Sequence, residues 1–364
     1  KDNHGGLMTK DQMVNWQSFM GVRQGHEWDR FEGIEDQPAY DEWLKQIPFF
    51  KNSSRRLKDD KVAVPELLSP KDKKLSTQAG FGKLLDYIAR QENPISKRLI
   101  TICPDVSGTT SLGSWINRKK LFARNPKRDV FKDSEIPSIA KWEAEPSGQH
   151  LELGIAEMNL FIALAAAGLS DSLFGKRLLP IGTLYDPFVC RGLDALNYAC
   201  YQDARFMIVG TPSGVTLAPE GGAHQSISTP LIGLSQDGIM SFEPAFVDEL
   251  SIIMSWGLSF MQQDDGGSIY LRLTTRPLEQ PKRQLTDNLK YDIVNGAYWW
   301  REPGPNCELI IAYQGVVADQ VFSAAGYLAE AKRDVGVLAV TSADRLQADL
   351  NKVRRKRSTD ADSS

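Results

Sequence analysis

The sequence is poor in cysteine, and its few cysteines are not spaced for metal binding. Cys103, Cys190, Cys200 and Cys307 lie far apart with no Cys-x-x-Cys pair, which excludes the common zinc motifs and predicts reduced thiols in a cytoplasmic protein. No apolar run reaches the roughly 18 residues that span a bilayer, so we expect no membrane association. A net charge of -3 gives no global reason to expect a nucleic-acid partner.

Both ends of the sequence are polar and weakly patterned. The chain begins Lys1-Asp2-Asn3-His4 without a Met or an apolar signal segment, and we expect it to be the interior of a longer protein. Residues 1–75 are predicted to be the end of an upstream domain plus a linker, with short helices at 11–19 and 39–46 and exposed chain at 51–61. Residues 354–364 are charged and polar without a fold signal and are predicted to be a solvated tail. A nucleic-acid patch is disfavoured there because no aromatic residues alternate with the basic ones.

From residue 76 onward, apolar runs typical of buried strands alternate with helical periodicity. Phe81, Leu84, Leu85 and Ile88 share one helical face. Since strands and helices alternate without hairpin signals, we expect an α/β fold with a doubly wound parallel sheet over residues 76–285. The expected strands are 98–105, 150–155, 178–184, 206–211 and 268–274, the expected helices are 78–91, 156–169, 189–204 and 247–262, and residues 115–148 are expected to be irregular.

A second run of the same pattern follows a polar, proline-containing segment at 280–288. Strands are expected at 308–313 and 335–340, flanking a helix at 317–332. These form one βαβ unit, which predicts a truncated second α/β domain over residues 290–364 that ends before it could close a core.

Residues capable of chemistry follow several of the expected strands. Asp105, Glu157, the Tyr185–Phe188 turn and His224 should cluster, because the carboxyl ends of parallel strands meet at one edge of a sheet. Each has a structural alternative. Glu157 could be an ordinary first-turn acid, Tyr185 and Phe188 could be core aromatics, and His224 could be an exposed loop residue among glycines. Together they favour a site.

Three motifs carry a family resemblance. Gly154-Ile-Ala-Glu157, Leu184-Tyr-Asp-Pro-Phe188 with Arg191, and Leu217-Ala-Pro-Glu-Gly-Gly-Ala-His224 resemble the pyrimidine-binding domain of thiamine-diphosphate enzymes. The 28-residue spacing from Glu157 to Tyr185 and the Thr211-Pro-Ser-Gly214 run are similar to the homodimeric E1 component of pyruvate dehydrogenase. The similarity covers about residues 76–345 and is strongest over 150–225.

The resemblance implies roles for the motif residues. Glu157 would hydrogen-bond the cofactor's pyrimidine N1′ and promote the tautomer that acts as a base. Phe188 would stack on the pyrimidine ring, with Tyr185 close by. His224 would face the reacting carbonyl of the substrate.

The resemblance also implies further cofactor contacts and an assembly. Ile155 and Asp105 match positions that line the cofactor pocket, and His4 resembles a histidine on the diphosphate side. The implied reaction is decarboxylation of a small 2-oxo acid, pyruvate or a homologue such as 2-oxobutyrate, with acyl transfer to a lipoyl-bearing E2 acyltransferase. The implied enzyme is a homodimer that uses thiamine diphosphate and Mg²⁺.

One element of the family pattern is missing. Such enzymes bind Mg²⁺ through a Gly-Asp-Gly motif, which this sequence lacks; Gln236-Asp237-Gly238 has the wrong first residue. We therefore expect no metal ligand in this chain, with Mg²⁺ bound by an upstream domain. Two alternatives stay open: ketol transfer between sugar phosphates as in transketolase, which the basic stretch 118–128 would suit, and a catalytically inactive remnant.

Overall fold

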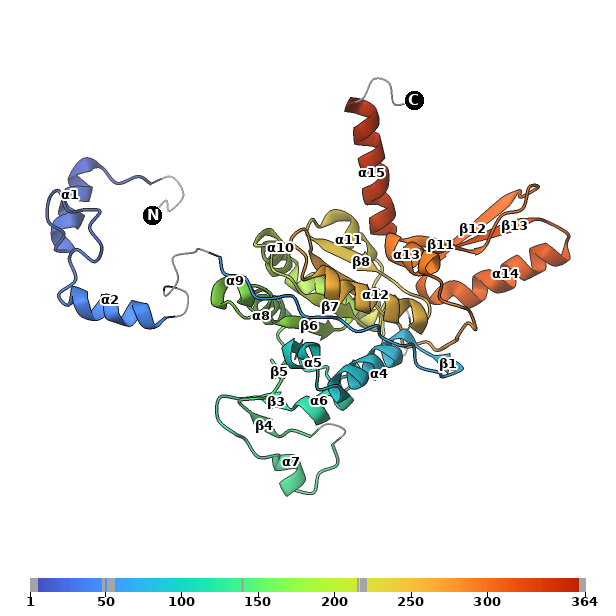
Figure 1. Cartoon of the computed structure of the whole chain (residues 1–364), viewed down its shortest axis with the longest axis horizontal. Coiled ribbons are helices and arrows are strands. Elements are labelled where there is room, and N and C mark those ends of the chain that lie inside the picture. Colours follow the sequence, from blue (N-terminus) through green and yellow to red (C-terminus); the bar gives the residue numbers. More distant parts are fainter. Residues whose placement is uncertain are drawn as a thin grey trace. The chain divides into compact units, whose positions relative to one another are not determined.

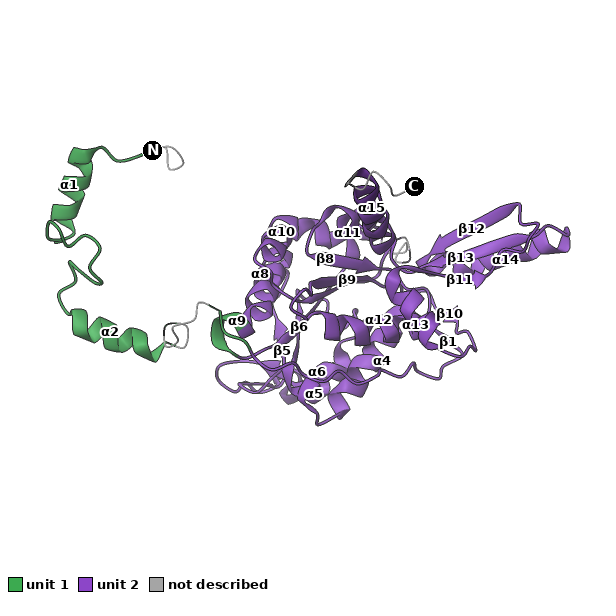
Figure 2. Cartoon of the chain, turned by 45° about the horizontal axis from the view of Figure 1, so that its top comes forward, with its two compact units in different colours: residues 1–58, 172–175 green, residues 59–171, 176–364 purple. Residues whose placement is uncertain are grey.

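The computed structural model describes residues 6–47, 50, 56–138, 141–214, 216 and 221–359. The chain divides into two compact units, residues 1–58 with 172–175 and residues 59–171 with 176–364 (Figure 2). In the first unit, the expected helices are confirmed as α1 (Lys10–Phe19) and α2 (Gln37–Gln46), and neither contains a buried residue. The three-domain division at residues 75 and 285–290 stays a prediction.

The second unit contains an eight-stranded sheet with the order β4-β3-β5-β2-β6-β7-β9-β8 (Figure 1). Every adjacent pair in it is parallel, which confirms the predicted fold class. The strands are β2 (Leu99–Cys103), β3 (Leu121–Phe122), β4 (Ala144–Glu145), β5 (His150–Glu152), β6 (Leu179–Leu184), β7 (Met207–Gly210), β8 (Ile239–Phe242) and β9 (Ser268–Arg272).

Helices cover both faces of this sheet, as the doubly wound prediction requires. Alternate residues of β7 face opposite sides, since Met207 and Val209 belong to one apolar cluster and Ile208 belongs to the other. The first cluster includes side chains of α4 (Thr77–Arg90), α6 (Gly113–Lys119) and α12 (Val247–Phe260). The second includes side chains of α8 (Glu157–Gly168), α10 (Leu193–Tyr201) and α11 (Pro230–Ser235).

Several local predictions over this sheet are wrong. The stretch 115–148 is not wholly irregular, because it contains β3, β4 and the short helix α7 (Val130–Asp133). Strand β8 was not anticipated, and β5 ends at Glu152 rather than at residue 155. The helix expected at 189–204 begins as the 3-10 helix η1 (Asp186–Gly192) before α10. Gly192 lies between them because a Cβ there would come within 2.1 Å of the Phe161 ring.

The C-terminal part of the second unit contains a three-stranded sheet of order β11-β13-β12. Strand β12 (Leu309–Gln314), α14 (Ala318–Glu330) and the parallel strand β13 (Val335–Val340) form the predicted βαβ unit. Two features differ from prediction. Strand β11 (Ala297–Arg301) runs antiparallel to β13, and α15 (Ala343–Thr359) extends through part of the tail expected to be unstructured.

Helix α13 (Asp287–Asn295) and the segment before it join the two sheets. Arg283 in this segment is mostly buried and donates to Asp248 at 2.7 Å and to Tyr298 of β11 at 2.7 Å. It also pairs with Glu249 at 3.4 Å. One guanidinium thus attaches the start of α12 to the C-terminal sheet.

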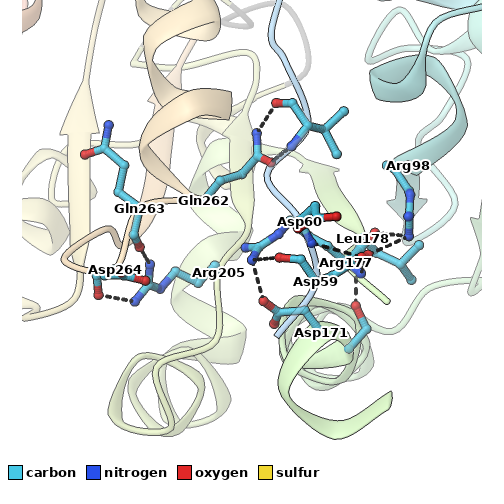
Figure 3. A network of polar contacts seen from close by, with 12 residues as sticks. Asp59, Asp60, Arg98, Asp171, Arg177, Leu178, Arg205, Gln262, Gln263 and Asp264 are labelled. Atoms are coloured by element: carbon cyan, nitrogen blue, oxygen red, sulfur yellow. Dashed lines mark hydrogen bonds and ion pairs between the residues drawn. The ribbon is translucent and has the colours of Figure 1, made fainter. Parts of the chain in front are cut away.

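The extended segment that begins the second unit at Asp59 is attached to the rest of that unit by a polar network (Figure 3). Asp59 pairs with Arg98 at 3.0 Å and accepts from the backbone N–H of Arg177 at 2.8 Å. The Gln262 amide accepts from the N–H of Val62 at 2.7 Å and donates to its carbonyl at 3.0 Å. Farther along, β1 (Lys74–Leu75) pairs with β10 (Leu278–Glu279). The exposure expected up to residue 61 is therefore wrong for Asp59, whose side chain is largely buried. Within the described ranges, no helix combines the length and apolarity needed to cross a bilayer.

Candidate functional site

Four neighbouring strands place loops at one edge of the parallel sheet. Strands β5, β2, β6 and β7 are adjacent and parallel, so the segments 153–156, 104–112, 185–192 and 211–229 leave the sheet at the same edge. The chain leaves β2 toward β3 and leaves β6 toward β7, in opposite directions across the sheet. Open parallel sheets bind ligands at such a point of divergence.

Three of the predicted site residues form one aromatic cluster. The ring centroids of Tyr185 and Phe188 are 6.0 Å apart, and each is 5.5 Å from the His224 ring. All three side chains are half-buried, and Phe188 also packs against the second apolar cluster. The Tyr185 hydroxyl donates to Oγ1 of Thr109 at 2.9 Å, which attaches the cluster to the loop after β2.

Glu157 is the first residue of α8 and is nearly buried, at 9% exposure. Its carboxylate Oε1 accepts from Nη1 of Arg191 at 2.8 Å, and the same guanidinium carbon lies 3.8 Å from the Phe188 ring centroid. The carboxylate thus pairs with a residue outside its own helix, which goes beyond the role of an ordinary first-turn acid. The Arg191 guanidinium therefore contacts both the Glu157 carboxylate and the Phe188 ring.

Asp105 and Ile155 lie on the same edge of the sheet but are exposed. Asp105 has a positive φ of 65°, and its backbone N–H donates to Oε1 of Glu152 at 2.8 Å. Ile155 is 79% exposed on the segment between β5 and α8. Their assignment to the cofactor pocket stays a prediction. His4 and residues 217–220 of the third motif lie outside the described residues.

A buried polar chain supports the loop that carries Asp105. Nδ1 of His150 lies 2.7 Å from Oγ1 of Thr101, and its Nε2 lies 3.4 Å from Oε2 of Glu152. Burial by itself would raise the pKa of Glu152, but hydrogen bonds from His150, the Asp105 N–H and Ser107 outweigh it and hold the pKa below its usual value. The sequence signal was available, since His150 and Glu152 are two apart on a strand and therefore face the same side.

Gln78 connects two of the site loops. Its amide nitrogen donates to the carbonyl of Thr109 at 2.8 Å, and its amide oxygen accepts from Oγ1 of Thr211 at 2.6 Å. Through Thr109, Gln78 also reaches Tyr185. This role of Gln78 has no signal in the sequence, because a polar residue in an amphipathic helix does not indicate a distant partner.

The site has the features needed by a flat heterocycle that carries a hydrogen-bond donor. The Arg191 guanidinium is planar, stacks on Phe188 and donates to Glu157. An aminopyrimidine protonated at N1′ would make the same two contacts, so these residues fit the pyrimidine part of thiamine diphosphate. Among the described residues, no group of three or more His, Cys, Asp or Glu side chains could hold a metal ion.

Comparison with known proteins gives a consistent result. Residues 56–281 match the profile described as pyruvate dehydrogenase E1 component middle domain. The pyruvate dehydrogenase E1 component of Mycolicibacterium smegmatis is 30% identical over 264 residues, covering 69% of this chain and 28% of the relative. The corresponding protein of Corynebacterium glutamicum is 27% identical over 301 residues, covering 78% of this chain and 32% of the relative. The chain therefore spans about a third of the length of the curated relatives it matches.

Solved structures show the same fold. A transketolase from Campylobacter jejuni superposes with a TM-score of 0.60 at 13% identity, covering 92% of this chain and 42% of that structure. A transketolase variant from Pichia stipitis gives a TM-score of 0.59 at 18% identity, covering 78% of this chain and 37% of that structure. At these identities the likeness concerns the fold alone.

Proposed function

The chain belongs to the pyruvate dehydrogenase E1 component family, and on this premise we propose that it forms the pyrimidine-binding half of a thiamine-diphosphate-dependent 2-oxo acid dehydrogenase. The substrate would be pyruvate or a close homologue such as 2-oxobutyrate, and the acyl group would pass to a lipoyl-bearing E2 acyltransferase. The observation that carries the proposal is the contact of Arg191 with both Glu157 and Phe188, which shows a carboxylate beside an aromatic face.

Each site residue has a defined task in this proposal. When bound, thiamine diphosphate supplies a nucleophilic carbon that adds to the carbonyl of the 2-oxo acid. Glu157 would hold the proton at the pyrimidine N1′, and its low exposure would keep water away from that contact. Phe188 would stack on the pyrimidine, with Tyr185 against the side of Phe188. His224 lies against both rings and would donate to the substrate oxygen.

Arg191 would give up its place to the cofactor. Its side chain is 55% exposed, so its pairing with Glu157 is partly solvated. Ion pairs of this kind contribute less than about 1 kcal/mol, and displacing the guanidinium from Phe188 therefore costs little. In the cofactor-free protein, Arg191 keeps the Glu157 carboxylate paired.

The diphosphate and Mg²⁺ would be bound by residues outside this chain. The sequence lacks Gly-Asp-Gly, and a homodimer in which another domain completes the site would supply the ligands. The surface beside Glu157 supports a contact with another domain, because large apolar side chains are exposed there and such patches are typical of interfaces. These side chains are Ile155 just before α8, and Met158 and Ile162 in its first half. A cytoplasmic location is consistent with four free cysteines.

Ketol transfer between sugar phosphates is the second candidate, because the fold is shared with transketolases. It would use basic residues of the stretch 118–128 to bind a phosphate. Arg118 is instead paired with Asp86 at 2.7 Å and Lys120 with Glu145 at 2.9 Å, which favours the 2-oxo acid. An inactive remnant is the third reading, and the missing Gly-Asp-Gly motif supports it.

The test is an activity assay on the native assembly, purified from its own cells through an affinity tag on this chain. We expect pyruvate-dependent ferricyanide reduction that requires both thiamine diphosphate and Mg²⁺, and co-purification of a lipoylated protein. Turnover of xylulose 5-phosphate without pyruvate oxidation would replace the proposal by transketolase chemistry. No turnover of either substrate would leave the inactive remnant.

A further inference from the structure

Asp186 is a buried carboxylate at the centre of the site edge, and none of the roles above uses it. Its side chain has no exposed surface. Thr229 donates to Oδ2 at 2.6 Å, and Arg272 donates to the same oxygen at 3.3 Å through Nη2. The hydroxyl of Ser226 also donates to Oδ2, and the hydroxyl of Tyr270 donates to Oδ1.

The donors come from two parts of the chain that are otherwise separate. Ser226 and Thr229 lie on the segment that follows His224, whereas Tyr270 and Arg272 lie on strand β9. Asp186 itself is at the start of η1. The carboxylate therefore joins the turn after β6, the loop after β7 and the end of β9.

Asp186 stands next to the residues that form the aromatic cluster. It follows Tyr185 directly and precedes Phe188 by two positions, while Ser226 follows His224 by two positions. Ser226 also closes the base of its loop, since its backbone N–H donates to the Gly214 carbonyl at 3.0 Å and its Oγ accepts from the Gly214 N–H at 2.9 Å. The hydrogen bonds of Asp186 thus connect the two backbone segments that hold the three rings.

The local chemistry requires a carboxylate at this position. All four partners donate, and a carboxylate presents acceptors on both oxygens. An asparagine would turn one of these acceptors into an N–H group that faces donors. The backbone of Gly210 also packs closely against this carboxylate, because a Cβ on Gly210 would lie 2.3 Å from Oδ1 of Asp186.

Arg272 extends the network away from the site. It lies between Asp186 and Glu243, and it donates to both carboxylates. Burial raises the pKa of Glu243, partly offset by Arg272. The backbone N–H of Glu243 donates to the Thr341 carbonyl at 2.8 Å, at the end of the C-terminal sheet. Arg272, which donates to Asp186, is therefore itself fixed by Glu243, and Glu243 is in turn fixed by the Thr341 carbonyl.

We propose that Asp186 is a positioning residue, which fixes His224 against Tyr185 and Phe188 by joining the two segments that carry them. The effect on turnover rests on the proposed function of this site. The effect on geometry does not, and it is measurable in the protein without cofactor.

The experiment uses the His224 resonance of the chain labelled with ¹³C at the histidine Cε1. The sequence has four histidines, so the spectrum is simple, and the variant His224→Gln assigns the signal. Because the two rings lie 5.5 Å from His224, their ring currents shift this signal away from that of an exposed histidine. In Asp186→Asn we expect the His224 signal to lose most of that shift or to split.

Two further variants keep the proposal falsifiable. Asp248→Asn is the matched control, since Asp248 is another buried acid paired with an arginine, the half-buried Arg283; here the His224 signal should stay in place. Thr229→Val removes one hydroxyl at nearly constant shape, so it is usable if Asp186→Asn does not fold, and it should shift the same signal. An unchanged His224 signal in Thr229→Val, or an equal change in Asp248→Asn, would overturn the proposal.

A kinetic measurement on the tagged native assembly distinguishes the positioning role of Asp186 from the proposed function of the site. We expect Thr229→Val to lower kcat at least tenfold, with the KM for pyruvate changed less than threefold, because His224 acts after binding. An equal rise in KM with unchanged kcat would contradict the positioning role. If the unaltered assembly oxidises no pyruvate while the His224 signal responds as expected, the proposed function fails and the geometric claim stands.

Discussion

Arg191 donates a 2.8 Å hydrogen bond to Oε1 of Glu157. The two residues lie on the segments that follow β6 and β5, on either side of β2 in the sheet. The same guanidinium lies over the ring of Phe188 at 3.8 Å. Arg191 therefore makes the two contacts that the proposed function assigns to the pyrimidine of the cofactor.

The first prediction concerns Arg191→Ala. If Arg191 only occupies the place of the pyrimidine, its removal takes away a weak competitor, worth less than about 1 kcal/mol. The thiamine diphosphate concentration that gives half-maximal pyruvate oxidation should then fall by roughly two- to five-fold. Urea unfolding of the variant should show almost unchanged stability. A cofactor requirement raised tenfold or more would mean that Arg191 helps to hold the cofactor or Glu157.

The second prediction concerns Glu152→Gln and pH. The pKa of Glu152 is lower in the folded protein than its usual 4.5, so the folded state binds the proton less readily than the unfolded state. The contribution of the ionised Glu152 carboxylate to the free energy of unfolding is therefore complete above about pH 4.5. It is lost as the pH falls through the pKa that Glu152 has in the folded protein. Glu152→Gln should unfold about 1–2 kcal/mol more easily in urea at pH 7.

The same comparison at lower pH checks the sign. The difference in free energy of unfolding between the unaltered protein and Glu152→Gln should become smaller as the pH is reduced below 4.5, because protonation of Glu152 removes the hydrogen-bonding advantage of the carboxylate. Glu330→Gln, an exposed residue at the end of α14, serves as the control with little change at either pH. A difference that becomes larger toward acid would contradict the assignment.

The third prediction concerns the connection between the two sheets. Arg283→Ala would leave Asp248 and Glu249 buried without their cation, and breaking such a pair costs about 3–5 kcal/mol. We expect a large loss of thermal stability by calorimetry. Arg333→Ala is the matched control, because Arg333 forms an exposed pair with Glu308 at 2.8 Å and should lower stability far less. Equal losses in the two variants would show that Arg283 does not join the sheets.

Much of the fold follows from sequence patterns that are long and periodic. Strands β6 and β9 are buried along their whole length and are mostly apolar, and α4 buries one regular stripe. Strand β8 escaped prediction because its four residues are buried only at the two ends. The last residues of helix α15, from 354 to 359, lie in the predicted tail because their charges dominate, although Leu346, Leu350 and Val353 before them recur at helical spacing.

The candidate site was predictable where its residues belong to a motif and unpredictable where they depend on distant partners. Tyr185, Phe188 and His224 do come together. The hydrogen bonds of Asp186, in contrast, reach residues 40 and 84 positions away. The sequence does not identify the hydrogen-bond partners of a buried charge. The partners of Asp186 are therefore known only from the structure, in which β9 packs next to the loop after β7.

The measurement that tests the central claim most directly is turnover of Glu157→Gln in the tagged native assembly. The exchange preserves shape and removes only the carboxylate that pairs with Arg191. We predict that thiamine-dependent pyruvate oxidation falls by at least about 100-fold, while the melting temperature stays close to that of the unaltered protein and the control Glu145→Gln on β4 keeps normal turnover. Near-normal pyruvate oxidation by Glu157→Gln would contradict the account.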